Sequence, residues 1–267
     1  MAIATLTPPP SMSSSLDKIP VWLDCDVGHD DAMAIILAAY HPNINLLGIS
    51  SVAGYSTIKH TTDNAIRVLK IAGIKGVKVH KGAHKPLIKK RVDSSIFHGR
   101  TGMARVSNLP DPNYESYFVE DVTAIEAMRK AIMKSPVSVS IVATGPLTNI
   151  ALLVSVYREV IPRIKTLSIM GGAIGFGDFT PAAEFNFFCD PDAAQMVFQS
   201  GIENIVLIPL EVTNTVLSTK TVLKRIQDEI TVPKFSTFAT EVLRVFGDTF
   251  SYIHDDKDGY PLQDPVA

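Results

Sequence analysis

Apolar segments rich in isoleucine and valine alternate with segments of helical periodicity along most of the chain, and this alternation constrains the fold most strongly. Strands are expected at residues 20–25, 45–52, 77–80, 137–143, 166–170 and 204–209, and helices at 30–40, 57–72, 121–133, 147–154 and 190–199. The expected strands are continuously apolar, which is typical of parallel strands buried on both faces. The sequence therefore predicts the α/β class, with an open, mostly parallel β-sheet flanked by helices and a Rossmann-like core.

The size and composition allow a large hydrophobic core. The chain has 267 residues, of which 46% are hydrophobic and 19% are charged. Residues 1–18 are rich in proline and serine and predict a flexible arm, whereas residues 19–267 are expected to form a single domain. The start of the chain lacks the basic and apolar regions of a signal peptide, and no run of about 18 apolar residues predicts a membrane span.

Charge and cysteine content narrow the class of partner and the compartment. The formal net charge is -2 and the pI is near 6.4, so the chain has no basic footprint for nucleic acid. A small polar ligand is the expected partner. The two cysteines, Cys25 and Cys189, form neither a disulfide framework nor a cysteine-based zinc site, and we expect a reducing, cytoplasmic location.

Polar residues gather where the expected strands end. They are Asp24 and Asp26 at the end of the first strand, Gly54 and Tyr55 after the second, Thr144 and Gly145, and Gly171 and Gly172. Open parallel sheets bind ligands at the carboxyl ends of their strands, so these residues predict a site at one edge. The weakly periodic residues 81–117 are expected to form loops over that edge.

The stretch LDCDVGHDD, residues 23–31, crowds four carboxylates together: Asp24, Asp26, Asp30 and Asp31. Such groups repel one another unless water, protons or a cation compensate. A helix N-terminus stabilises a negative charge by about 0.3–1 kcal/mol, which explains one carboxylate as a cap but not four. A hard cation with oxygen ligands, Ca²⁺ or Mg²⁺, fits the cluster better.

One enzyme class that uses such a cluster is the haloacid-dehalogenase-like phosphatases. Asp24 and Asp26 have the spacing of the strand-ending Asp-x-Asp that supplies their nucleophile and acid, and Thr144 is a candidate for their later Thr or Ser. That class also needs a late acidic pair at the end of an apolar run. The sequence has no such pair, so this interpretation is the weaker alternative.

A second resemblance covers nearly the whole chain. DCDVGHDDAMAI resembles the Asp-x-Asp-x-Gly-x-Asp-Asp signature of the inosine-uridine nucleoside hydrolases. Three further stretches agree in the family's order: IVATGPLTNIA, SIMGGAIGFGDFTPAAEFNFFCDPDAA and QDPVA. The resemblance implies a nucleoside-hydrolase-like fold, hydrolysis of the N-glycosidic bond of ribonucleosides in purine and pyrimidine salvage, and a homodimer or homotetramer. Members usually continue beyond the last stretch, so this chain is expected to lack their C-terminal end, and Asp264 to lie in a frayed tail.

The resemblance implies that the cofactor is a tightly held Ca²⁺. Its protein ligands would be Asp26, Asp31, the main-chain carbonyl of Thr144, and Asp264, joined by a water and the ribose 2′- and 3′-hydroxyls. A vicinal diol is a natural bidentate oxygen ligand, and a metal-bound water loses its proton more easily. Asp26 would be the general base toward that water, and the surrounding carboxylates would stabilise an oxocarbenium-like transition state.

The resemblance also implies contacts to the ribose. Asp30, Glu184 and Asn186 would hold its hydroxyls, and Met170 would pack under the ring or fill the core. Other interpretations stay open for two of these positions and for the predicted metal ligand Asp264. Glu184 and Asn186 could cap the turn before Asp190, and Asp264 before a proline could be a turn residue.

Three positions depart from the family's usual pattern: Tyr55 and Asp178 stand where Asn is common, and Gln263 stands where many members have His. Glutamine cannot deliver a proton near neutral pH, so the acid for the leaving base has to be sought elsewhere. Candidates are Tyr252, His254 and His98, of which His98 lies in an expected His-Gly loop near the site. These departures leave open a homologue that binds nucleosides but turns them over weakly.

Overall fold

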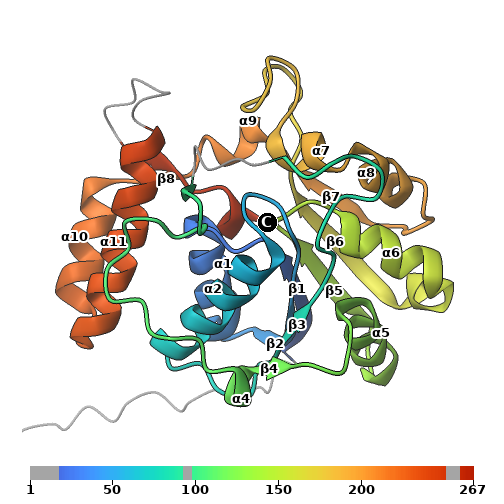
Figure 1. The fold of residues 1–267 in the computed structure, drawn as a ribbon, viewed down its shortest axis with the longest axis horizontal. Coiled ribbons are helices and arrows are strands. Elements are labelled where there is room, and N and C mark those ends of the chain that lie inside the picture. The colour runs from blue at the N-terminus through green and yellow to red at the C-terminus, as the bar shows by residue number, and fades with distance from the viewer. Residues whose placement is uncertain (1–17, 93–97, 251–258) are drawn as a thin grey trace, which may run out of the picture.

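The computed structural model describes residues 18–92, 98–250 and 259–267. Its centre is a sheet of seven parallel strands in the order β4-β3-β2-β1-β5-β6-β7 (Figure 1). The strands are β1 (Ile19–Cys25), β2 (Ile44–Ser51), β3 (Val79–Lys81), β4 (Phe118–Val119), β5 (Val139–Ala143), β6 (Ile164–Met170) and β7 (Ile205–Ile208). The predicted α/β class and open parallel sheet are confirmed.

Helices cover both faces of the sheet. The longer ones are α1 (His29–Tyr40), α2 (Ile58–Ile71), α5 (Ala124–Lys134), α6 (Thr148–Val156), α8 (Pro191–Phe198), α10 (Lys220–Glu229) and α11 (Pro233–Phe250). Successive residues of β1 point to opposite faces, so Trp22 packs with α5, α6 and α8, whereas Leu23 packs with α1, α2 and α11. Fully burying a large apolar side chain contributes about 1.5–3 kcal/mol, so these two clusters fix the strand between its helical layers.

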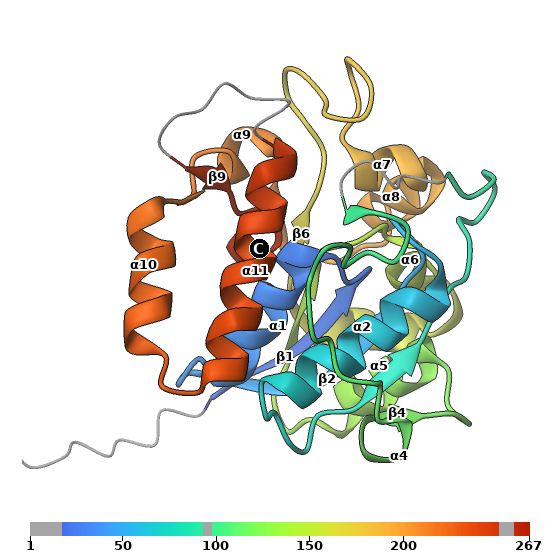
Figure 2. The ribbon, with the colours of Figure 1, turned by 60° about the vertical axis from the view of Figure 1, so that its left-hand side comes forward.

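Short elements complete the fold. They are α4 (Tyr114–Tyr117), α7 (Phe185–Cys189), α9 (Leu210–Thr213), the 3₁₀ turns η1 (Arg158–Arg163) and η2 (Asp264–Val266), and an antiparallel pair of β8 (Leu217–Ser218) and β9 (Tyr260–Pro261). The expectation that residues 81–117 are loop throughout is wrong at its ends, because β3 extends to Lys81 and α4 occupies residues 114–117. The helical pair α10 and α11, side by side in Figure 2, was not predicted.

The topology places a crevice beside β1. From β1 the chain builds outward through β2, β3 and β4, and then returns to the other side of β1 to begin β5. Such a switch in direction leaves a ligand-binding crevice at the carboxyl ends of the two central strands. η2 packs against α1 near this point, so the last residues of the chain lie beside the end of β1 (Figure 1).

Candidate active site at the end of the first strand

The connection from β1 to α1 carries the first carboxylates of the site. The backbone N–H of Gly28, the N-cap residue of α1, donates to a carboxylate oxygen of Asp31 at 2.7 Å. Two other backbone segments lie against Asp26, since a Cβ at Gly145 would lie 2.7 Å from its Oδ1 and one at Gly54 would collide with its Oδ2. Glycine at both positions therefore lets the main chain approach this carboxylate closely.

Three carboxylates from opposite ends of the sequence converge here. Asp30, Asp31 and Asp264 each offer an oxygen, these atoms lie within 4.8 Å of one another, and all three side chains are buried. Asp264 begins η2 and is 4% exposed, so the expectation of a frayed tail at this position is wrong. The packing of η2 on α1 supplies the order that sequence position alone did not suggest.

Asp26 lies beside this trio, and only one of its two oxygens has a hydrogen-bond donor among the described residues. Its Oδ2 accepts the backbone N–H of Tyr55 at 2.9 Å, whereas its Oδ1 is buried without a hydrogen-bond partner among the described residues. Oδ1 of Asp30 is likewise buried without a hydrogen bond there, 3.8 Å from Nε2 of His98. Buried carboxylate oxygens without donors are costly, so each of these atoms calls for a proton or a cation.

Burial dominates the electrostatics of the cluster. It raises the pKa of Asp30 to about 7, with the neighbouring Asp31 adding to the effect. Burial also raises the pKa of Asp26 and of Asp264 well above the ordinary range, and each is raised further by the neighbouring carboxylates. The pKa of Asp31 is raised by burial too, against the hydrogen bonds from Gly28 and Thr144. The carboxylates cannot all ionise together without compensating charge.

The donor set suits a hard divalent cation. It consists of the buried oxygens of Asp30, Asp31 and Asp264, which lie within 4.8 Å of one another. Asp30 and the adjacent Asp26 each have a buried oxygen without a hydrogen bond from the described residues. Ca²⁺ takes six to eight oxygen ligands at roughly 2.3–2.6 Å, so the protein's oxygens and a substrate diol together could fill its shell. The residues present therefore fit a metal.

Thr144 connects the end of β5 to this cluster through its side chain. Its hydroxyl donates to Oδ1 of Asp31 at 2.7 Å, a contact that the sequence did not predict. Its carbonyl oxygen, the predicted ligand, accepts the side-chain amide of Asn186 at 2.9 Å. The same amide reaches the carbonyl of Met170 at 3.2 Å, so Asn186 bridges the ends of β5 and β6.

Glu184 acts as the N-cap of α7. Its Oε1 accepts the backbone N–H of Asn186 at 2.7 Å, and its Oε2 accepts those of Gly172 at 2.8 Å and Phe187 at 3.1 Å. Burial, with the nearby Asp178, raises its pKa to about 7. The capping interpretation of Glu184 is therefore observed, and both of its oxygens already have donors.

An aromatic group closes one side of the site. The ring of Tyr55 stacks on Phe185, with centroids 4.0 Å apart at 6°, and lies 4.3 Å from the ring of His98. Asp178 accepts the backbone N–H of Phe185 at 2.9 Å and so holds this group from the start of α7. Gln263 is buried next to Asp264. The predicted residue Tyr252, like His254, lies outside the described residues.

Two sets of contacts were missed by sequence reasoning. Asp24 does not join the trio: its Oδ1 accepts from the hydroxyl of Ser50 and from Asn149 at 2.8 Å, and its Oδ2 is buried without a hydrogen bond among the described residues. Burial raises its pKa to about 7. His29, within the acidic motif, contacts His98 rather than a carboxylate, with the two Nδ1 atoms 3.0 Å apart. Both sets join residues far apart in the sequence.

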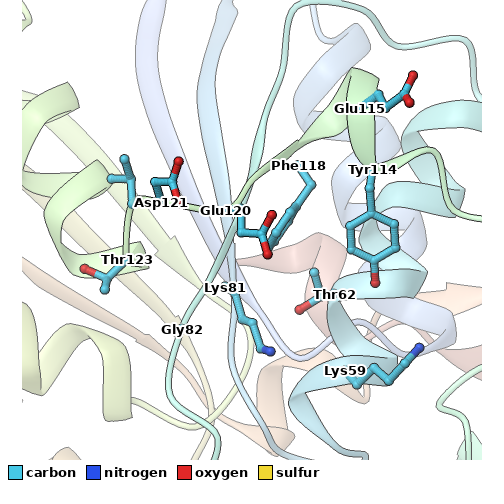
Figure 3. A pocket seen from close by; sticks show the side chains of 11 residues that line it. Lys59, Thr62, Lys81, Gly82, Tyr114, Glu115, Phe118, Glu120, Asp121 and Thr123 are labelled. Atoms are coloured by element: carbon cyan, nitrogen blue, oxygen red, sulfur yellow. The ribbon is translucent and has the colours of Figure 1, made fainter.

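A separate hollow of about 820 Å³ lies beside β3 and β4, and none of the predicted site residues lines it (Figure 3). The hollow is lined by both positively and negatively charged side chains. Four of them, Lys59, Lys81, Glu115 and Glu120, are exposed. Lys59 is paired with Asp63 at 2.7 Å. Size alone does not make this hollow the reaction site, because its charges are solvated while those of the carboxylate cluster are buried.

Comparison with known proteins agrees with this site. Residues 21–267 match the family model described as inosine-uridine preferring nucleoside hydrolase. The pyrimidine-specific ribonucleoside hydrolase RihA of Citrobacter koseri is 41% identical over 252 residues, which is 93% of this chain and 78% of the relative. A probable ribonucleoside hydrolase of Dictyostelium discoideum is 38% identical over 266 residues, covering 94% of this chain and 76% of the relative.

Solved structures show the same architecture. The purine-preferring ribonucleoside hydrolase from Gardnerella vaginalis superposes with a TM-score of 0.83 at 29% identity, covering 92% of this chain and 78% of that one. The plant nucleoside hydrolase PpNRh1 gives a TM-score of 0.83 at 27% identity, covering 93% and 76%. Within the described part of the chain, no helix combines the length and apolar character needed to cross a membrane.

Proposed function

Because the chain belongs to the inosine-uridine preferring nucleoside hydrolase family, we propose that it hydrolyses the N-glycosidic bond of ribonucleosides at the carboxylate cluster beside β1, releasing ribose and the free base. The observation that carries the proposal is the convergence of Asp30, Asp31 and Asp264, whose buried oxygens lie within 4.8 Å of one another. The phosphatase interpretation receives no support from these comparisons.

The proposed cofactor is Ca²⁺. Asp31 and Asp264 would hold it, together with Asp26 and the carbonyl of Thr144, while the open oxygen of Asp30 faces the same space. When bound, the ion would compensate the crowded charge, receive the 2′- and 3′-hydroxyls of ribose and lower the pKa of a coordinated water. This assignment explains why oxygens of Asp26 and Asp30 have no donor among the described residues.

Asp26 is the proposed general base. Its Oδ2 is held by the backbone N–H of Tyr55, which fixes the carboxylate while Oδ1 stays available. In the proposed step, water adds through its oxygen to C1′ of the ribose, and one of its protons passes to Asp26. The C1′–N bond breaks and its electron pair leaves with the base. The neighbouring carboxylates stabilise the positive charge that develops on the sugar.

His98 is the proposed group that supplies the proton to the departing base. It is buried at the edge of the site, with Nε2 3.8 Å from Oδ1 of Asp30. Gln263 cannot do this work, since an amide does not release a proton near neutral pH. His98 takes up a proton from solvent and passes it to the departing base, while the proton that Asp26 takes from water returns to solvent, so each turnover leaves the protein unchanged.

The test is a substrate panel with the full chain. We expect reducing sugar from at least one of uridine, cytidine, inosine and adenosine in the presence of Ca²⁺, and a large loss of rate after chelation. Because one relative is named as pyrimidine-specific, uridine and cytidine are the first substrates to try. Absence of ribose release from all four with added Ca²⁺ would overturn the proposal.

Calorimetry with the same nucleosides distinguishes an enzyme that hydrolyses them from a protein that only binds them. Tyr55 fills the space between Phe185 and His98 with a stacked ring, where the family's usual Asn would leave a polar contact. This packing favours, as a second candidate, a protein that binds nucleosides and hydrolyses them weakly. Calorimetry that shows uridine binding without ribose release would support that candidate over the first.

A further inference from the structure

His29 stands between the carboxylates of the acidic motif, yet its side chain contacts a different part of the molecule. Its Nδ1 lies 3.0 Å from Nδ1 of His98, and its Nε2 lies 3.1 Å from the carbonyl oxygen of Ala104. Its backbone N–H donates to the same Nδ1 of His98 at 3.2 Å. One residue at the start of α1 therefore contacts both ends of the segment 98–104.

That segment is a closed turn rather than a loose loop. The N–H of Ala104 donates to the carbonyl of His98 at 3.1 Å, and the N–H of Gly102 donates to the carbonyl of Gly99 at 3.2 Å. Gly99 and Gly102 have φ of 71° and 80°, a conformation that favours glycine. Asn64 of α2 adds a hydrogen bond to the carbonyl of Thr101 at 2.7 Å. The turn presents His98 from a fixed frame.

The His98 ring sits in a slot that leaves it one orientation. On one side it stacks with His29, the centroids being 5.3 Å apart at 21°, and on another it meets the ring of Tyr55. A Cβ added at Gly28 would lie 2.7 Å from Nδ1 of His98, so glycine there makes room for the ring. With Nδ1 held against His29, Nε2 faces Asp30 and the carboxylate cluster.

We propose that His29 is a positioning residue for the hydrolysis: it holds the His98 imidazole by its ring and at Nδ1, which either accepts the His29 backbone N–H or bonds to Nδ1 of His29, so that Nε2 of His98 faces the departing base. The inference rests on the proposed function of His98. A buried imidazole has few ways to hold one ring orientation without such contacts, and a proton donor that is turned or shifted by about 1 Å loses much of its effect. Loss of His29 then slows the departure of the base while leaving the binding of ribose intact.

Two substrates with different leaving groups test this. A nucleobase needs a proton as it leaves, whereas p-nitrophenolate from p-nitrophenyl β-D-ribofuranoside leaves as a stable anion. For His29→Phe, which keeps a stacked ring but removes both ring nitrogens, we expect kcat on the best ribonucleoside of the panel to fall roughly tenfold to a hundredfold, with KM within about twofold. We expect kcat on the p-nitrophenyl riboside to stay within about threefold.

Further variants make the result decisive. His98→Ala should show the same selectivity, and His29→Phe combined with His98→Ala should be no slower than His98→Ala alone, because two residues acting through one step are not additive. If His29→Phe does not fold by thermal melting, His29→Gln replaces it, since it keeps a donor for the Ala104 carbonyl but loses the ring. His84→Gln, at an exposed histidine of the chain, should leave both substrates unchanged.

Each negative result would overturn a different part of the proposal. Equal loss of kcat on both substrates for His29→Phe and His29→Gln, with His98→Ala selective, would overturn the positioning role of His29 and leave that of His98. A His98→Ala variant that is not selective would overturn both roles. No ribose release by the unaltered protein from either kind of substrate would overturn the proposed function itself.

Discussion

Two buried acidic regions lie along the same edge of the sheet, and they differ in how their oxygens are used. Around β1 and η2, Asp26 and Asp30 keep oxygens without hydrogen bonds from described residues. At α7, Glu184 is equally buried, but both of its oxygens accept backbone N–H groups. Burial raises the pKa in both regions, so the pKa alone does not separate them. The unoccupied oxygens do, because they leave room for an external ligand.

Removing the charge of the proposed base, Asp26, should have the largest effect. In Asp26→Asn the side chain still offers an oxygen to the N–H of Tyr55, so we expect the melting temperature to change little. A general base contributes roughly 10²–10⁴-fold, and kcat for ribose release should fall by that order. Reducing-sugar assays and thermal melting on the same preparation measure the two effects. An Asp26→Asn variant as active as the parent would refute the role.

The next largest effect concerns the metal. If the trio holds Ca²⁺, the ion should stabilise the protein by about 2.7 kcal/mol at a concentration 100 times its Kd, which corresponds to an increase of roughly 5 °C in melting temperature. Asp264→Asn removes one anionic oxygen from the trio, and we expect calcium affinity, measured by calorimetry after chelation, to fall roughly a hundredfold. Glu184→Gln is the matched control from the other region. Equal calcium affinity in all three proteins would show that the trio is not the metal site.

The stability of the metal-free protein and the stabilisation by Ca²⁺ should both depend on pH. Without metal, the pKa of Asp30 is about 7 in the folded protein against an ordinary value of 3.8, so between about pH 4 and pH 7 the folded state binds more protons than the unfolded state. The free energy of unfolding of the metal-free protein therefore falls as the pH rises through this window. Ca²⁺ competes with those protons, so the stabilisation that it gives should grow over the same window. Thermal melts in chelator and in Ca²⁺ that run parallel from about pH 4 to pH 7 would contradict this.

Local sequence patterns predicted most of the sheet and the start of the site. Continuous apolar runs identified β1, β2, β3, β5, β6 and β7, because burial on both faces leaves a signal within each strand itself. The short β4 and the pair β8 and β9 left no such signal, since a strand of two residues exists only through its partner. The helix α11 was missed because its apolar face, with Phe238 and Val242, is recognisable only against the core that it covers.

In the site, too, some features were predictable from the sequence and others depend on three-dimensional neighbours. The family resemblance brought Asp26, Asp31, Thr144 and Asp264 into one prediction, and the structure gathers Asp31 and Asp264 with Asp30. That Asp24 bonds instead to Ser50 and Asn149, and that His29 meets His98, follows from three-dimensional neighbours across β2, α6 and the 98–104 turn. A pattern of residue types shows which chemistry is present, whereas the packing decides which of several adjacent acids performs it.

The smallest effect is expected at Glu184, the N-cap of α7. In Glu184→Gln the amide keeps one acceptor oxygen, while its NH₂ group now faces an N–H donor of Gly172, Asn186 or Phe187. Loss of a charged cap and of one hydrogen bond should lower the free energy of unfolding by about 1–2 kcal/mol, measured by urea denaturation. Calcium affinity should stay within about twofold, because no metal contact is lost. The KM for ribonucleosides decides the remaining question: if Glu184 also holds a ribose hydroxyl, as the family resemblance predicts, KM rises by more than tenfold, and if it only caps α7, KM stays unchanged while stability falls.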